Sequence, residues 1–273
     1  MGHIASLHVY PVKSCRGIDV PDALVAPTGL EWDRRWMILA ARNKFVTQRT
    51  HPKLAIITVA VGSGQLTLSA EEHGSVSVDV QQAGESRRTR VWDDDCNGLD
   101  VGDEPAAWLT RVLGEPMRLV RIDPAVPRNA DPKYAGAEAQ PINFTDGYPV
   151  LMISRASLDA LNRRLPAPIP MGRFRPNVVI DGVPEHAEDA MALFRFGKVV
   201  LRGVKHCTRC AVTTTDQQTG VRDPHQQPLR TLHQYRHDRL LRGVTFGQNC
   251  TLHAGVGQRL AVGAALSIEP YQV

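Results

Sequence analysis

The sequence has no long hydrophobic run and few cysteines. No stretch approaches the ~18 consecutive apolar residues that a membrane-spanning helix requires. The amino-terminal residues lack the charged region and apolar core of a secretory signal peptide. Five cysteines in 273 residues are too few, and odd in number, for a secreted disulfide scaffold. We therefore expect a cytoplasmic protein with reduced thiols and no membrane partner.

Lysine is also scarce, because only six of the 32 basic residues are lysines and the rest are arginines. The formal net charge of +4 is too small to indicate a nucleic-acid partner. Arginine presents a rigid fork that suits phosphates and carboxylates. The excess of arginine is compatible with an anionic ligand, although genomic codon bias produces the same composition.

Two common catalytic motifs are missing. The chain has no G-x-x-x-x-G-K-[ST] sequence and no G-x-S-x-G sequence. These absences disfavour a P-loop NTPase and a hydrolase with a nucleophile elbow.

The first half of the chain has the pattern of short strands. Residues 65–69 and 75–80 alternate apolar and polar side chains, and glycine-rich turns separate runs of this kind from residue 4 to about 100. A helix is predicted from Asp103 to just before Gly114, followed by a strand at 117–122. The pattern predicts a β-barrel or sandwich, with a boundary in the proline-rich stretch that begins at residue 123.

The second half interleaves helices with strands. A short strand at 150–153 precedes a helix that Ser154 caps and that runs to Leu165, and a buried strand follows at 178–180. Residues 229–241 are predicted as a basic amphipathic helix that buries Leu240 with other apolar residues. We therefore predict a mainly β fold with α/β elements, divided into domains at 1–122 and 123–273.

The segment Lys205-His206-Cys207-Thr208-Arg209-Cys210 concentrates reactive groups. Thiolates bind metals and attack electrophiles, and nearby Lys and Arg favour the thiolate form. A zinc or iron–sulfur site would need about four ligands, and no second C-x-x-C pair exists. Haem attachment needs a histidine after the pair, and the β-branched residues 211–215 favour a strand over the helix of a thioredoxin site. Two readings remain: a single cysteine bonded to a cofactor, or two partly buried thiols beside a basic turn.

Three basic clusters each adjoin a predicted strand. They contain Lys13 and Ser14, Arg34, and Arg175 with Asn177. Each is explained equally well as a solvated turn, but together they could converge on one anionic ligand.

These segments in this order resemble a known family. The sequences Tyr10-Pro11-Val12-Lys13-Ser14, Asp33-Arg34, Arg175-Pro176-Asn177, Cys207-x-Arg209-Cys210 and Phe246-Gly247-Gln248 are similar to those of MOSC-domain proteins that carry an N-terminal MOSC β-barrel domain. In pattern the chain resembles the mitochondrial amidoxime-reducing components and the bacterial reductases of N-hydroxylated bases. The likeness extends over nearly the whole chain.

The resemblance implies a molybdenum–molybdopterin cofactor between an N-terminal β-barrel at 1–122 and a MOSC β-barrel with peripheral helices at 123–273. It makes Cys210 the protein ligand of the metal and Cys207 dispensable. It assigns Arg209, Asp216 and His206 to proton transfer or support of the site. It assigns the remaining cofactor contacts to a set of basic, hydroxyl and amide side chains: Lys13, Ser14, Arg34, Ser154, Arg175, Asn177, Thr208 and Asn249.

The resemblance also implies a reaction and a partner. The expected activity is reduction of small N-hydroxylated molecules (hydroxylamines, N-hydroxylated bases, amidoximes). Relatives with a ferredoxin-like domain or an amino-terminal anchor have segments that this sequence does not show, and we expect no iron–sulfur cluster or haem in the chain. Electrons would then come from a separate ferredoxin or flavoprotein reductase. A cofactor-binding or sulfur-transfer module without this activity, and a β-rich interaction protein without cofactor, are the alternatives. Asn249 stands where the mitochondrial pattern has an aromatic residue, so the pocket wall is expected to differ.

Overall fold

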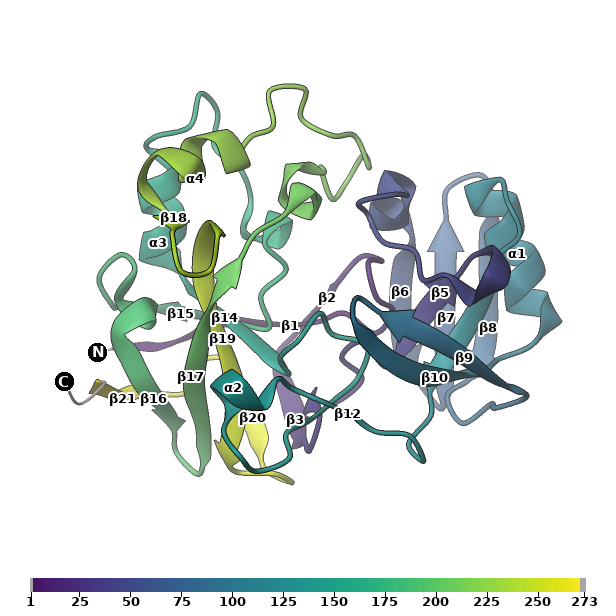
Figure 1. The fold of residues 1–273 in the computed structure, drawn as a ribbon, viewed down its shortest axis with the longest axis horizontal. Coiled ribbons are helices and arrows are strands. Elements are labelled where there is room, and N and C mark those ends of the chain that lie inside the picture. Colours follow the sequence, from purple (N-terminus) through teal and green to yellow (C-terminus); the bar gives the residue numbers. More distant parts are fainter. Residues whose placement is uncertain (1, 271–273) are drawn as a thin grey trace.

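The protein has two β-rich lobes. The computed structural model describes residues 2–270. Figure 1 shows one lobe built around β5 to β10 and α1, and a second around β14 to β21 with α3 and α4. The prediction of a mainly β fold with few helices is confirmed.

One large sheet forms the centre of the second lobe. Its strands in spatial order are β2 (Ile18–Val20), β1 (His3–Val9), β15 (Val178–Asp181), β14 (Val150–Ser154), β19 (Gly243–Ala254), β17 (Val199–Thr208), β16 (Met191–Phe196) and β21 (Ser267–Pro270), with β18 (His237–Asp238) paired to β19. Most pairs are antiparallel, and β14 runs parallel to β15.

The first strands of the chain belong to this second lobe. Leu7 of β1 is opposite Val178 of β15, in a pair separated by most of the sequence. The next hairpin, β3 (Asp22–Ala26) with β4 (Gly29–Leu30), pairs through β3 with β20 (Arg259–Ala261). The sheets therefore cross the predicted division at residue 122, and the loop after β1 is held against the loop before β15.

The first lobe is a curled arrangement of two smaller sheets. One has the order β5 (Trp36–Leu39), β11 (Arg118–Ile122), β10 (Asp94–Asp100) and β9 (Ser86–Val91), and the other has β6 (Thr58–Gly62), β7 (Gln65–Ala70) and β8 (Gly74–Asp79). Helix α1 (Asp103–Leu113) packs Trp108 and Leu109 into the core of this lobe. Gly114 ends α1 in a left-handed conformation, as its position predicted.

Three other helices and several 3-10 turns complete the fold: α2 (Pro132–Ala135), α3 (Arg155–Asn162), α4 (Leu229–Tyr235), η1 (Ala41–Asn43), η2 (Pro52–Ile56), η3 (Met171–Arg173), η4 (Ala187–Ala190) and η5 (Ala211–Thr214). The small hairpin between the lobes consists of β12 (Arg128–Asn129) and β13 (Pro141–Ile142). Within residues 2–270, none of the helices combines the length and hydrophobicity needed to cross a bilayer.

Two local predictions were wrong. The helix expected over 229–241 ends at Tyr235, because His237 and Asp238 pair with β19, and Leu240 is 94% exposed instead of buried. The β-branched residues 211–214 form the 3-10 turn η5 instead of a strand. In that turn the hydroxyl of Thr213 donates to the carbonyl of Cys210, a local hydrogen bond that competes with strand pairing.

Glycine is required at position 247, where β19 pairs with β14. Its φ of +80° lies in the left-handed region, and a Cβ atom there would come within 2.6 Å of Ile153 Cγ1 and 2.8 Å of the Met152 carbonyl oxygen. The second contact is with backbone and cannot be relieved by a rotamer change. Both the conformation and the packing therefore favour glycine at this position.

We expect Gly247→Ala to destabilise the protein more than Gly257→Ala does. Gly257 has nearly the same φ, +83°, with open space around it. It therefore reports the conformational cost alone, about 1–2 kcal/mol. The clash should add roughly 1 to 3 kcal/mol at position 247. Urea unfolding of both variants measures the difference, and equal losses would show that β14 and β19 are not packed as described.

Candidate functional site

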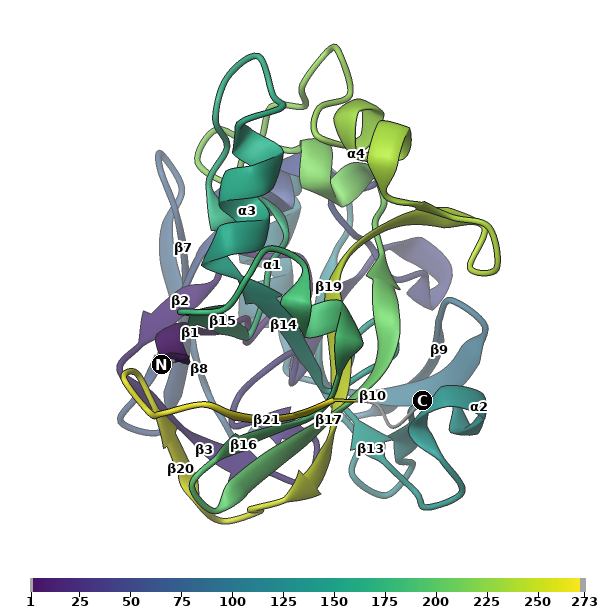
Figure 2. The same cartoon turned by 90° about the vertical axis from the view of Figure 1, so that its left-hand side faces the viewer.

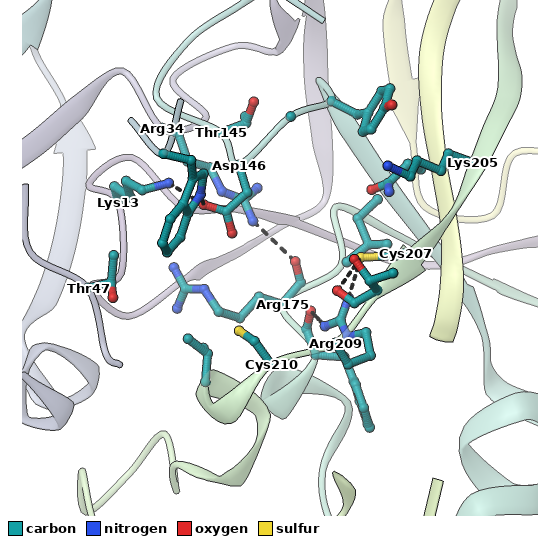
Figure 3. Close-up of a pocket in the computed structure, with 18 of the residues that line it drawn as sticks. Lys13, Arg34, Thr47, Thr145, Asp146, Arg175, Lys205, Cys207, Arg209 and Cys210 are labelled. Atoms are coloured by element: carbon teal, nitrogen blue, oxygen red, sulfur yellow. Dashed lines mark hydrogen bonds and ion pairs between the residues drawn. The ribbon is translucent and has the colours of Figure 1, made fainter. Parts of the chain in front are cut away.

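A cavity of about 630 Å³ lies between the two lobes. Figure 3 shows side chains from both lobes directed into it. Its walls come from the first half of the chain, the loops before β14 and β15, β17 with the residues after it, and β19. The lining residues include Lys13, Ser14, Arg34, Trp92, Thr145, Asp146, Tyr148, Arg175, Asn177, Lys205, Cys207, Thr208, Arg209, Cys210 and Asn249.

Backbone hydrogen bonds bring the basic loops together. The N–H of Lys13 donates to the Trp36 carbonyl over 2.8 Å, and the N–H of Arg34 donates to the Tyr10 carbonyl over the same distance. Tyr10 in turn donates its hydroxyl to the Pro176 carbonyl, beside Arg175. The structure therefore gathers all three predicted basic clusters at one cavity.

Lys13 is buried at the edge of the cavity and is paired. Its Nζ donates to the Phe144 carbonyl at 2.8 Å and to Asp146 Oδ1 at 2.5 Å. Burial lowers the pKa of Lys13, and the attraction of Asp146 opposes this shift. Burial raises the pKa of Asp146, but Lys13 and the indole N–H of Trp92 outweigh it and hold that pKa below its usual range.

Arg34 and Arg175 share one aromatic platform. Each guanidinium carbon lies 4.3 Å from the centroid of the Tyr10 ring. Burial raises the pKa of Tyr10 to about 12, so the ring stays neutral between them. Arg34 is neutralised by Asp33, whose Oδ2 lies 2.6 Å from Arg34 Nη1.

Arg175 has no such carboxylate. Its Nη1 donates to the Cys15 carbonyl at 2.7 Å, but its buried Nη2 has no hydrogen-bond partner among the described residues. Burial, followed by repulsion from Arg34, lowers the pKa of Arg175 to about 10. An unpaired buried donor costs about 1–3 kcal/mol, and more when it is charged. The cavity thus contains an unsatisfied cation that an anion would stabilise.

Four of the residues that line the cavity hold unusual backbone conformations. Ser14, Arg34, Trp92 and Arg175 have φ values of 69°, 47°, 56° and 56°. Such left-handed conformations cost a non-glycine residue about 1–3 kcal/mol and are concentrated at ligand sites. The loops are therefore shaped for the cavity and not for local stability.

The five cysteines fall into two groups. Cys15, Cys96 and Cys250 are buried, and burial raises the pKa of each thiol, that of Cys15 to about 12. Only Cys207 and Cys210 are partly exposed, and both line the cavity. These two are the thiols that chemistry in the cavity could use.

The two thiols have different surroundings. Cys207 Sγ accepts a hydrogen bond from Arg209 Nη1 at 2.7 Å, and Arg209 is also held by the Phe174 carbonyl. Cys210 lies where the chain leaves β17 and enters η5, and Figure 3 shows its sulfur directed into the cavity beside the Arg175 side chain. Cys210 is therefore the thiol placed to bind a group next to the unsatisfied guanidinium.

Three predicted residues lie away from the cavity. Ser154 is fully buried, and its hydroxyl caps α3 by accepting from the N–H of Ser157. Asp216 accepts from backbone N–H groups of the turn that follows it and pairs with Arg173 at 3.1 Å. His206 faces Asp189 and Asp238. Thr208, Asn177 and Asn249 do line the cavity.

Sequence reasoning missed the loop before β14. Thr145, Asp146 and Tyr148 all line the cavity, and the Thr145 and Tyr148 hydroxyl oxygens are buried without partners among the described residues. Thr145 and Asp146 fall at the end of the proline-rich stretch interpreted as a boundary, where periodicity carries no information. Its run of polar residues between two apolar segments was the available signal.

The described part of the chain provides no complete metal cage, because no cluster of three or more of its His, Cys, Asp or Glu side chains is arranged to hold a metal ion. A metal beside Cys210 would therefore take its other ligands from a cofactor.

Comparison with known proteins agrees with this arrangement. A family model described as the MOSC N-terminal beta barrel domain matches residues 1–116, and one described as the MOSC domain matches residues 139–266. The chain is 35% identical over 246 residues to the mitochondrial amidoxime-reducing component 1 of Homo sapiens, a match that covers 86% of this chain and 72% of the relative. It is 34% identical over 245 residues to the protein of the same name from Mus musculus, with the same coverage.

A third relative, the mitochondrial amidoxime reducing component 2 of Rattus norvegicus, is 32% identical over 247 residues, covering 86% of this chain and 73% of the relative. Matches of this extent include both lobes and the cavity between them. The chain belongs to the family of MOSC-domain proteins that includes the mitochondrial amidoxime-reducing components.

Proposed function

We propose that the chain binds a molybdenum–pterin cofactor in the cavity between the lobes and reduces N-hydroxylated small molecules. The observation that carries the proposal is the buried, unpartnered Nη2 of Arg175 in the cavity that also contains the Cys210 thiol. The relatives are named amidoxime-reducing components, which points to the same chemistry.

The residues of the cavity fit such a group. A pterin phosphate needs cationic forks and hydroxyl donors, and the cavity offers Arg175, Arg34 and the unpartnered hydroxyl of Thr145. Lys13 adds a third cation, already shared with Asp146. The Cys210 thiolate would supply the single protein ligand of the metal.

The net reaction consumes two electrons and two protons. The N–OH group, two electrons and two protons give an N–H group and water. When bound, the molybdenum–pterin group supplies the oxygen-atom transfer chemistry, which belongs to the cofactor and not to the protein. The chain holds that group through Arg175 and Cys210 and confines the substrate in the cavity.

Other residues would orient the substrate. Burial raises the pKa of Tyr148, so its unpartnered hydroxyl keeps its proton and can donate a hydrogen bond to a bound oxygen. Asn249 lines the same cavity and offers an amide. Arg209 positions Cys207 and the wall of the cavity by its bonds to Sγ and to the Phe174 carbonyl. Asp216 and His206 are not proposed for proton transfer, because both lie outside the cavity.

One observation favours a second candidate function, sulfur transfer. Arg209 Nη1 donates to Cys207 Sγ over 2.7 Å and so holds that sulfur at the wall of the cavity, where a cysteine could carry sulfur instead of binding metal. In that case Cys207, and not Cys210, would be the essential residue.

Turnover of a simple hydroxylamine or benzamidoxime with reduced methyl viologen tests the proposal directly. Protein produced in a host that makes the molybdenum cofactor should form the corresponding amine or amidine. Cofactor-loaded protein that yields no reduced product would leave the sulfur-transfer function as the better account.

The two cavity cysteines should differ in their importance. We expect Cys210→Ala to abolish turnover and change the optical spectrum of the bound metal, because the thiolate ligand is lost. Cys207→Ala should retain at least about a fifth of the activity, since it loses a bond of about 1 kcal/mol to Arg209 that positions only the wall. Equal losses in the matched variants would instead indicate a disulfide or a pair of ligands.

Replacement of Arg175 by methionine should separate cofactor binding from folding. Exchange of a buried, poorly compensated charge for an apolar side chain of similar length changes stability by only about 1 kcal/mol or improves it. Retained molybdenum and pterin should fall at least tenfold in Arg175→Met, measured by metal analysis and pterin fluorescence. Arg111→Met, at an exposed position of α1, is the control. Full cofactor retention in Arg175→Met would contradict the assignment.

A further inference from the structure

A second cavity, of about 570 Å³, adjoins the first. Arg209 lines both, so the side chain that contacts Cys207 Sγ at 2.7 Å is also a wall of this outer cavity. The other walls come from α4, from the loop before it and from β19, and include His225, Leu229, Arg230, His233 and Val244. We call this surface the α4 face. Figure 2 shows α4 at the periphery of the second lobe, followed by the turn that leads into β19.

The α4 face is basic. None of the residues that line the outer cavity is acidic, whereas Arg230, His225 and His233 are exposed there. The ring of His237 lies 4.8 Å from that of His233 and extends the cluster. Among the described residues Arg230 forms no ion pair, so its charge is available to a partner.

The aspartates of the same segment do not cancel this charge. Residues 221–242 contain five arginines and three histidines against only two aspartates. Asp223 Oδ1 accepts hydrogen bonds from the backbone of His225 and Gln227. Asp238 Oδ1 accepts from the backbone of Leu240 and Leu241. Both carboxylates are held in turns, and Asp189 from outside the segment pairs with Arg236. Arg230, Arg239 and Arg242 are exposed and form no ion pair among the described residues.

Large apolar side chains flank the charges. Leu240 is 94% exposed and Val221 is 64% exposed, at opposite ends of the segment. Two separate apolar side chains add little contact area, so charge remains the feature that defines this surface.

We propose that the α4 face docks an acidic electron-carrier protein that supplies the cavity. The inference rests on the proposed function, in which the reduction of each N–OH group consumes two electrons and two protons. A one-electron carrier would deliver the two electrons in two encounters. A carrier seated on the α4 face would contact Arg209, which also lines the inner cavity. The cationic surface steers an acidic partner and fixes its orientation.

The expected complex is weak and sensitive to salt. Interfaces of electron-transfer encounters are small, often below about 1,200 Å² in total, and charge complementarity affects their association rate more than their lifetime. A face on which arginines and histidines outnumber the carboxylates fits this kind of partner better than a large apolar interface.

The test uses the cofactor-loaded protein and an acidic [2Fe–2S] ferredoxin as the probe. Arg230→Glu should lower ferredoxin-driven kcat/KM at least tenfold at low ionic strength and leave the methyl viologen-driven rate unchanged. Arg111→Glu is the matched control, since Arg111 is also an exposed helical arginine without an ion pair among the described residues. His233→Glu provides a second variant of the α4 face.

Calorimetric titration of ferredoxin against each protein measures docking without turnover. Weaker binding by Arg230→Glu and His233→Glu, with normal binding by Arg111→Glu, would support docking at the α4 face. This holds even if the protein reduces no N-hydroxylated substrate, because that failure would reject only the proposed function. Equal affinity of ferredoxin for the wild type and both α4-face variants, or an equal loss in Arg111→Glu, overturns the docking inference.

Discussion

The site depends on one buried guanidinium. Arg175 is held between the Tyr10 ring and the Cys15 carbonyl, close to a second arginine, and one of its nitrogens has no partner among the described residues. Such a cation is tolerated only if its surroundings force it into place and an anion completes it. The left-handed backbone conformations of Ser14, Arg34 and Arg175 likewise lower local stability, and they shape the cavity.

The large sheet of the second lobe holds Arg175 in this position. Pairing of β1 with β15 places the loop after the first strand against the loop that carries Arg175. The alternating runs that form β7 and β8, and the glycine that ends α1, could be read from the sequence, since both are local patterns. The pairing of β1 with β15 could not, because strand partners so far apart in the sequence leave no periodic trace. The early end of α4 was likewise decided by pairing of His237 with β19.

The candidate site, like the fold, could be predicted in part from the sequence. Lys13, Arg34 and Cys210 belong to motifs whose order resembled the family, and the structure brings them to one cavity. Ser154 was misplaced because a serine that begins a helix has the same signature whether it caps that helix or binds a ligand. Thr145 was missed because an irregular loop provides no pattern, although its orphaned hydroxyl is evident once the fold is known.

The central claim is that a molybdenum–pterin group completes the buried cation and the Cys210 thiol. Metal analysis and pterin fluorescence on wild-type protein, purified from a host that makes the cofactor, test this claim most directly. The account predicts about one molybdenum and one pterin per chain, the stoichiometry of a single cofactor site held by one cysteine. Folded protein from that host with neither molybdenum nor pterin would contradict it.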